Sequence, residues 1–374
     1  MAQTDFSNMG LQKRLAWATS LWEVFRVRSF ASQFMGNDSN SAIQRITELT
    51  KVNGAWKAVI QLVGDLVDDG TAGDNELEGN EEALRAWEKQ IQYDMLRHAV
   101  RNKGKLSDLR STISFRNKAK DVLGVFFSDR IDQMMMLTAA GIDYTKNTNG
   151  STRDAGSALL EMSFRADVAA PTQNRWLRGT AAGGIAYGNT ASIVAADKMN
   201  YKSLVRAKAF AKETGLRGIR SGSDEVFYIM TTPQGMADLR LDPDFIQAVE
   251  NAHIRGEGNP IFKGVTTVMV DGMIIQEHQY VPNTMRAASG SKWGATGTVD
   301  GIACLMLGAQ ALAFADFGAP EWNEKDFDYG NNHGVATGKV FGMLKPKFHN
   351  DITGQDEDFG MLRIDFAISP LTLP

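Results

Sequence analysis

The chain has 374 residues, of which 43% are hydrophobic and 22% are charged, so its composition is that of an ordinary globular protein and not of a disordered or fibrous one. It has 40 Lys and Arg residues against 44 Asp and Glu residues, giving a net charge of -4. This balance argues against tight wrapping of nucleic acid, which needs a basic excess to neutralise phosphates. A protein that only encloses nucleic acid needs no such excess.

The N-terminal part predicts an amphipathic arm and no secretion signal. Apolar residues recur between positions 10 and 35, which favours a helix or arm that lies against another surface. Lys13 and Arg14 interrupt the apolar residues, so there is no apolar core of a signal peptide. The single cysteine, Cys304, cannot form an internal disulfide. Both features fit a protein made in a reducing cytoplasm.

Residues 51–106 predict a long hairpin with an acidic tip. Two stretches, one around Ile60 and one from Trp87 to Tyr93, alternate apolar and polar residues as strands do. The segment from Gly64 to Glu82 contains no Lys or Arg. Its acidic residues are Asp65, Asp68, Asp69, Asp74, Glu76, Glu78, Glu81 and Glu82. A two-stranded hairpin alone is marginal in water, so we expect a partner surface to receive this tip.

A basic stretch follows the hairpin and is a candidate receiver for the tip. Between residues 97 and 120 there is one acid, Asp108, and the basic residues are Arg97, Arg101, Lys103, Lys105, Arg110, Arg116, Lys118 and Lys120. The acidic and basic blocks can pair within one chain. They can also pair head to tail between chains, which generates rings. A third reading is that they are two unrelated solvated faces.

The rest of the chain predicts a mixed α+β fold. A four-residue apolar repeat indicates a helix over residues 108–140 that ends at Gly141, with a bend or close crossing at Gly124. Residues 141–195 have no regular pattern. After them, the patterns indicate a helix at 201–214, a strand at 226–230, helices that begin at Pro233 and Pro243, a tight hairpin at Asp271-Gly272, and a last strand at 362–368.

The sequence contains no recognisable catalytic, cofactor-binding or metal-binding motif. Residues 334–339 (GVATGK) have the wrong length for a phosphate-binding loop, and the glycine-rich stretch 179–188 lacks the spacing of a dinucleotide site. The five histidines lie far apart, without the spacing of a metal site. The acid pair Asp242/Asp244 is explained by capping of the helix at Pro243. We therefore expect no catalytic residue, no cofactor and no metal.

Several runs of residues resemble the major capsid proteins of tailed bacteriophages, as typified by enterobacterial phage N-four. In chain order they are residues 33–36 (QFMG), 43–51 (IQRITELTK), 77–84 (LEGNEEAL), 96–101 (LRHAVR), 129–133 (DRIDQ), 232–236 (TPQGM), 241–244 (LDPD) and 327–330 (FDYG). They cover most of the chain in the order of the family.

The resemblance implies the Hong Kong 97-type capsid fold. It also implies a division into parts, which are an N-terminal arm (1–50), an extended E-loop hairpin (51–106), a P-domain with a long spine helix (107–195), an A-domain (196–318) and C-terminal strands that return to the P-domain (319–374). The predicted hairpin, long helix and mixed lobe provide a candidate for each part.

The implied function is that of a major capsid protein. Such a protein assembles with itself into hexamers and pentamers of an icosahedral shell, which encloses the double-stranded DNA of a tailed phage without sequence-specific binding. The implied partners are further copies of the chain, a portal, scaffolding proteins and, in some relatives, decoration proteins, with no membrane. Assembly is expected in the host bacterial cytoplasm, and the final location is the virion capsid.

Two alternatives stay open. One is a cellular nanocompartment shell of the same fold, which would form small particles that carry protein and not DNA. The other is an enzyme without a recognisable motif. The long acidic arm disfavours the enzyme, because a monomeric enzyme has no use for it.

Overall fold

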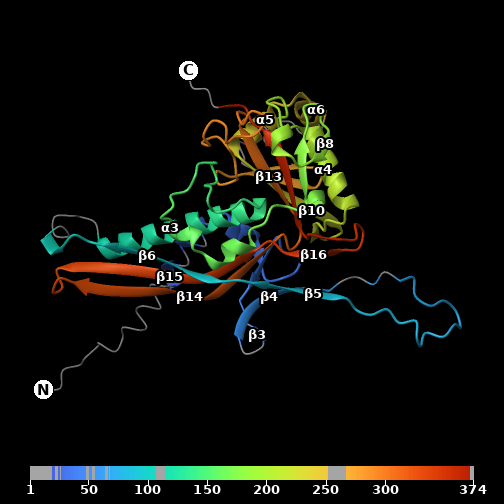
Figure 1. Cartoon of the computed structure of the whole chain (residues 1–374). Helices are drawn as coiled ribbons and strands as arrows, with labels where there is room; N and C mark the ends of the chain where they lie inside the picture. Colours follow the sequence, from blue (N-terminus) through green and yellow to red (C-terminus); the bar gives the residue numbers. More distant parts are fainter. Residues whose placement is uncertain are drawn as a thin grey trace.

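The computed structural model describes residues 19–370, apart from residues 22–23, 26, 48–49, 53–54, 64–65, 67, 107–113 and 252–266. Figure 1 shows an elongated layer in which one helix lies along long strands, an upper lobe built around a second sheet, and an arm that leaves this body on one side. None of the described helices is long and apolar enough to cross a membrane.

The elongated layer is a sheet whose described strands follow the order β1-β2-β14-β15-β6. The strands are β1 (Met35–Gly36), β2 (Ile43–Ile46), β6 (Asp94–Arg101), β14 (Leu312–Phe327) and β15 (Asn332–Leu344). The two longest, β14 and β15, form an antiparallel hairpin, and β6 pairs antiparallel with the outer side of β15. One face of this sheet is buried, since Trp322 and Val335 pack against Leu123 of the long helix.

The long helix, α3 (Phe115–Ala140), confirms the prediction for its described part, while residues 107–113 lie outside the described residues. The four-residue repeat is its buried stripe, with Leu123 and Phe127 almost without exposure. Gly141 ends the helix with a φ of 67°, which glycine adopts at little cost. Gly124 lies at a close crossing, because a Cβ there would be 2.9 Å from Val24 Cγ1 of the N-terminal segment.

The upper lobe is built on a second sheet, whose described strands follow the order β11-β12-β10-β13-β18-β7-β8, with β9 beside β10. Its strands are β7 (Trp176–Gly179), β8 (Ile185–Tyr187), β9 (Ile219–Ser221), β10 (Asp224–Thr231), β11 (Thr267–Val270), β12 (Met273–Glu277), β13 (Gly301–Leu307) and β18 (Met361–Ala367). Its helices are α4 (Tyr201–Glu213), α5 (Pro233–Arg240) and α6 (Pro243–Asn251). The predicted hairpin is confirmed, since Asp271 and Gly272 both have positive φ angles, of 48° and 67°.

The arm begins with three strands, β3 (Thr50–Val52), β4 (Ala55–Val63) and β5 (Ala86–Ile91), in the order β3-β4-β5. β4 and β5 pair antiparallel from Ala58↔Ile91 to Val63↔Ala86, which confirms the predicted hairpin. A separate hairpin of β16 (Lys347–Asn350) and β17 (Gln355–Asp358) lies between the root of the arm and the upper lobe (Figure 1). The short 3-10 helices are η2 (Ala31–Phe34), η3 (Ala158–Leu160), η4 (Ser163–Asp167), η5 (Gln173–Arg175) and η6 (Thr190–Ser192).

Three strands lie in a different sheet from the one that the predicted boundaries suggest. β6, which was assigned to the E-loop hairpin 51–106, pairs with β15. β7, assigned to the P-domain 107–195, pairs in parallel with β18, and β18, assigned to the strands that return to the P-domain, sits in the sheet of the upper lobe. These pairings join residues between about 50 and 250 positions apart, which local patterns cannot reveal. The division of the chain into five parts stays a prediction.

Candidate assembly surfaces

The acidic tip projects from the body of the subunit (Figure 1). Asp65 lies outside the described residues. The described carboxylates that are solvent-exposed are Asp68, Asp69, Asp74, Glu76, Glu78 and Glu81, and Glu82 is half-buried. Two of them bond within the tip, where the Asp68 N–H donates to Glu82 Oε2 at 2.9 Å and the Gly79 N–H donates to Glu81 Oε2 at 2.8 Å. These bonds shape the loop locally and leave most of its charge facing water.

One ion pair fastens the base of the tip to the body. Arg85 Nη1 lies 2.7 Å from Asp351 Oδ1, in the turn between β16 and β17. The same guanidinium also lies 3.6 Å from Glu82. Since both partners of the 2.7 Å pair are partly exposed, it is worth only about 0–1 kcal/mol. The ion pair therefore orients the arm and does little to hold the rest of the tip.

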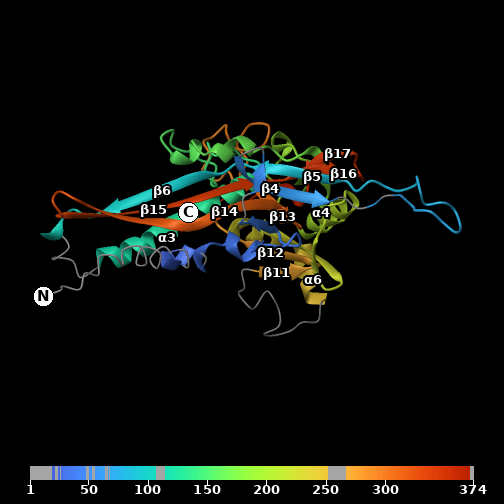
Figure 2. The same cartoon turned by 90° about the horizontal axis from the view of Figure 1, so that it is seen from below.

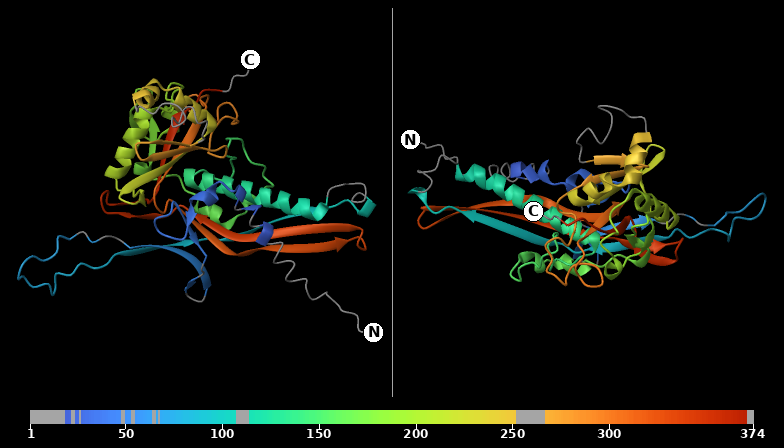
Figure 3. Two further views of the ribbon diagram at one scale, coloured as in Figure 1. Left: turned by 180° about the vertical axis from the view of Figure 1, so that it is seen from behind. Right: turned by 90° about the horizontal axis from the view of Figure 1, so that it is seen from above.

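The tip and the basic stretch lie at opposite ends of the molecule. In Figures 2 and 3 the arm leaves one end, while β6 runs toward the other end, where α3 begins. The reading in which the acidic and basic blocks pair within one chain is therefore wrong for the described residues. Pairing between chains and two unrelated faces remain as readings.

The sheet divides the predicted receiver between two faces. His98 on β6 stacks on Phe126 of α3, with ring centroids 4.2 Å apart, so the even-numbered residues of β6 face the helix. Neighbouring residues of a strand point to opposite faces. Arg97 and Arg101 therefore project from the face that is turned away from α3, and both are exposed.

The other described basic residues of the predicted receiver lie outside β6. Arg116 and Lys120 belong to α3, where Arg116 Nη2 lies 2.7 Å from Glu324 and Lys120 Nζ lies 3.2 Å from Ser20 Oγ. Lys118 is exposed on the same helix, and Lys103 and Lys105 follow the end of β6. Arg110 lies outside the described residues. The structure thus brings Arg97 and Arg101 together and separates them from the helix residues.

The outer face of the sheet also contains residues that the sequence analysis missed. The register places Gly338 beside Arg97 and Glu321, Ala336 beside Ala99 and Asn323, and Gly334 beside Arg101 and Lys325. The central strand, β15, thus contributes only small side chains, which lie between the charged side chains of β6 and β14. The resulting groove has a volume of about 460 Å³. We call the surface formed by these nine residues the outer face.

One aromatic ring closes the outer face at its distal end. The guanidinium of Arg101 lies 4.6 Å from the ring centroid of Phe327, and Lys325 Nζ lies 5.2 Å from it. Gly334 makes room for this ring, since a Cβ there would be 2.8 Å from Phe327 Cε2. The face has three cations, Arg97, Arg101 and Lys325, against one carboxylate, Glu321. It therefore suits an acidic partner.

The N-terminal segment is held on α3 by a buried carboxylate. Asp132 accepts hydrogen bonds from Ser29 Oγ at 2.6 Å, from the Phe30 N–H at 2.9 Å and from the Ala31 N–H at 3.2 Å. Burial raises the pKa of Asp132 to about 6, although these three hydrogen bonds act in the opposite direction. Phe30 stacks on His278 at 4.1 Å, and burial lowers the pKa of this histidine to about 4. The imidazole is therefore neutral at pH 7.

The described residues contain no group of three or more His, Cys, Asp or Glu residues that could hold a metal ion. Cys304 is buried, and burial raises the pKa of its thiol to about 12, so the reactive thiolate is scarce at pH 7. Three hollows of the described surface, at the outer face, beside α4 and between the arm and the upper lobe, are open and lined in part by charged side chains.

Comparison with known proteins identifies the class of molecule to which these surfaces belong. The profile of a family described as phage capsid protein matches residues 11–370. The chain belongs to this phage capsid family. A curated relative, the major capsid protein of Pseudomonas phage KPP25, is 42% identical over 368 residues, which are 97% of each chain.

Solved structures agree with the family and with the fold. The capsid of Ralstonia phage GP4 is similar with a TM-score of 0.74 and 25% identity, over 93% of each chain. The capsid asymmetric unit of cyanophage Pam1 matches with a TM-score of 0.67 and 19% identity, over 91% of this chain and 92% of that one. The predicted Hong Kong 97-type capsid fold, an α+β fold, is confirmed. This chain is a major capsid protein, as the sequence analysis predicted.

Proposed function

We propose that the chain assembles into hexamers and pentamers of an icosahedral shell that encloses the double-stranded DNA of a tailed phage. The observation that carries this proposal is the arm, whose acidic tip leaves the body and faces solvent while the cationic outer face lies at the other end of the same subunit. An isolated protein gains nothing from such a separation. A protein that joins copies of itself end to end uses both surfaces.

The contact that builds the ring is formed by the tip of one copy on the outer face of the next. Charge complementarity supports this pairing, since Gly64 to Glu82 contains eight acids and no Lys or Arg, whereas the outer face has three cations and one acid. A head-to-tail contact between two different surfaces closes into a ring when the rotation between copies is suitable. Each contact is weak, and its repetition around a closed lattice gives the shell its stability.

The shell acts without chemistry of its own. Its partners are a portal, scaffolding proteins and decoration proteins, and it holds DNA as cargo without reading its sequence. Assembly takes place in the host bacterial cytoplasm, and the product is the capsid of the virion. The net charge of -4 supports enclosure of DNA over tight binding to it.

Electron microscopy of the purified, expressed chain tests the proposal. We expect rings of five and six subunits or closed shells at native salt, and particles of phage-head size when portal and scaffolding proteins are co-expressed. A natively folded chain that stays monomeric at high concentration would count against a shell function. Small particles of uniform size that carry host protein would point to a nanocompartment.

A further inference from the structure

The hairpin of β16 and β17, residues 347–358, lies between the arm and the upper lobe and belongs to neither sheet. Among the described strands, β16 and β17 pair only with each other, from Lys347↔Asp358 to Asn350↔Gln355. No backbone ladder therefore fixes this hairpin to the body. Two-residue connections join it to β15 and β18, and side-chain contacts from two sides hold it between the arm and the lobe.

Apolar packing and one ion pair join the hairpin to the root of the arm. Phe348 is buried in a cluster with Ile60 of β4 and Ile91 of β5. The rings of Trp87 and His349 lie 6.3 Å apart. The Arg85–Asp351 ion pair at 2.7 Å adds a contact at the turn of the hairpin. The arm and the hairpin are thus packed together.

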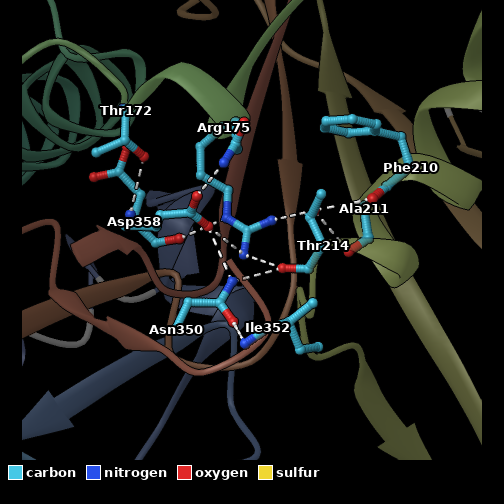
Figure 4. A network of polar contacts seen from close by, with 10 residues as sticks. Thr172, Arg175, Phe210, Ala211, Thr214, Asn350, Ile352 and Asp358 are labelled. Carbon is cyan, nitrogen blue, oxygen red and sulfur yellow. Dashed lines mark hydrogen bonds and ion pairs between the residues drawn. The ribbon is translucent and has the colours of Figure 1, made fainter. Parts of the chain in front are cut away.

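Polar contacts join the other side of the hairpin to the end of helix α4 (Figure 4). The Thr214 carbonyl accepts from Arg175 Nη2 at 2.8 Å and from Asn350 Nδ2 at 2.7 Å. This carbonyl is at the C-terminal end of α4, where the helix dipole favours donors. Arg175 also lies 3.2 Å from Glu357 Oε2, and its Nε donates to the Asp358 carbonyl at 3.0 Å.

This network is buried, which makes it difficult to separate. Arg175, Glu357 and Asp358 each have an exposed fraction of 2% or less. Breaking a buried ion pair leaves an uncompensated charge and is strongly unfavourable. The hairpin is therefore held firmly to Arg175 of η5, which in turn bonds to the end of α4, whereas the partly exposed Arg85–Asp351 pair is the weaker link.

A cleft separates the root of the arm from the upper lobe above the hairpin. It has a volume of about 520 Å³ and is lined by Leu62 and Trp87 on the arm and by Lys212 and Arg217 on the lobe. The hairpin forms its floor through Phe348 and Asn350. A change in the direction of the arm can therefore reach the lobe through the hairpin without direct packing between arm and lobe across the cleft.

We propose that the β16–β17 hairpin couples the orientation of the arm to the C-terminal end of α4. Displacement of the arm moves the hairpin through Phe348, Trp87 and Asp351, and the hairpin pulls on the Thr214 carbonyl through Asn350. The conformation of the upper lobe then responds to the state of the arm. This coupling operates within one subunit and does not depend on where the arm docks.

Hydrogen exchange of the unassembled, full-length subunit tests the coupling. The reporters are the amides of Thr214 and Leu216, which donate to Phe210 and Ala211 at 2.9 Å and 2.8 Å. Arg85→Ala removes the ion pair on the arm side, and we expect it to speed exchange of these distant amides by about twofold to fivefold. The exposed Lys89, on the same arm, provides the control Lys89→Ala, which should leave both amides unchanged.

A double-mutant cycle separates coupling from general loosening. Asn350→Leu has a similar size and removes the hydrogen bond to Thr214, together with the bonds of Asn350 to Glu357 and Ile352, so we expect faster exchange of the reporters. Arg85→Ala added to Asn350→Leu should then have a smaller effect than it has in the wild type, because one of the two connections is broken and only the path through Arg175 is left. Two effects that multiply as independent changes would overturn the proposal, and so would reporters that do not respond to Arg85→Ala.

Asp351→Asn breaks the same ion pair from the hairpin side and must reproduce the effect of Arg85→Ala. This second variant keeps the test decisive if one of the variants does not fold. Because all measurements use the unassembled subunit, they succeed or fail independently of shell assembly.

Discussion

At the scale of single residues, Asp132 connects the N-terminal segment to the long helix. Its folded pKa of about 6 lies above the value of 3.8 for an exposed aspartate, so the folded state binds more protons between these two pH values. Through this group, stability is therefore greatest below about pH 4 and falls as the pH rises through 6. The carboxylate fastens the segment at pH 7 despite the cost of its burial.

We expect Asp132→Asn to remove this pH dependence. At pH 5 the variant should be less stable than the wild type, because one acceptor oxygen is lost. Between pH 5 and pH 8 the gap should narrow by about 1.4 kcal/mol, because about one pKa unit of proton-linked stability is left at pH 5 and none at pH 8. Urea unfolding of the unassembled subunit at both pH values measures the gap. The control Asp121→Asn makes the same substitution at a half-exposed position of the same helix, away from the buried site.

Substitution of Lys325 tests the proposed role of the outer face in assembly, at a position that the sequence analysis did not select. Lys325→Glu reverses one of its three cations, so we expect the concentration needed for assembly to rise by up to about fivefold, as for the loss of an exposed ion pair. Glu321→Lys reverses the only carboxylate of the same face and should leave that concentration unchanged or lower it. Light scattering against protein concentration measures both variants. Equal effects of the two changes would show that the sign of the charge does not matter there.

At the scale of elements, the acidic tip is the feature with the clearest consequence for assembly. Replacing Glu76, Glu78, Glu81 and Glu82 with Gln should leave the subunit folded, since these side chains make few contacts in the body, and should impair assembly. Added salt should likewise weaken assembly more than folding, because exposed charges are screened over about 8 Å at physiological ionic strength. Circular dichroism measures folding, and electron microscopy measures assembly. Normal shells from the variant would disprove a role for the tip.

Local patterns predicted elements far better than surfaces. The buried residues in the first half of α3 recur every four positions because this part packs on the sheet of β6 and β15, and the repeat is visible in the sequence. The alternation in β4 and β5 likewise follows from burial on one side. The outer face has no such local signal, since Arg97 lies beside Gly338 only through the register of β6 and β15.

The basic stretch shows the limit of sequence proximity. Arg97 and Arg116 are 19 positions apart and lie on opposite sides of the sheet, whereas Lys325, more than two hundred positions away, shares the face of Arg101. A spacing of small residues, Gly334, Ala336 and Gly338, was the only local sign of the groove. Its meaning depended on knowing which strands flank it.

At the scale of the whole molecule, the net charge limits how tightly the protein can bind DNA. With a net charge of -4, the chain has no excess of phosphate-neutralising residues. We expect binding to naked duplex that is weaker than about 1 µM at physiological salt and independent of sequence, as in non-specific binding. Fluorescence anisotropy with two unrelated duplexes measures both properties. Nanomolar affinity, or a preference for one duplex, would contradict enclosure without binding.

The tip and the outer face lie at opposite ends, so each subunit has two different ends and a direction. If the tip docks on the outer face as proposed, a copy with the four Gln replacements in its tip still receives the tip of a neighbour but cannot dock its own. Such a copy would leave one contact of the ring unmade. Co-expressed as a minority with wild-type chain, it should stop ring growth on one side only and reduce the yield of shells by more than its share of the subunits. Native mass spectrometry of the mixture should then find open oligomers that contain a single variant copy. A shell yield that falls only in proportion to the variant fraction would show that rings tolerate the loss of one tip contact.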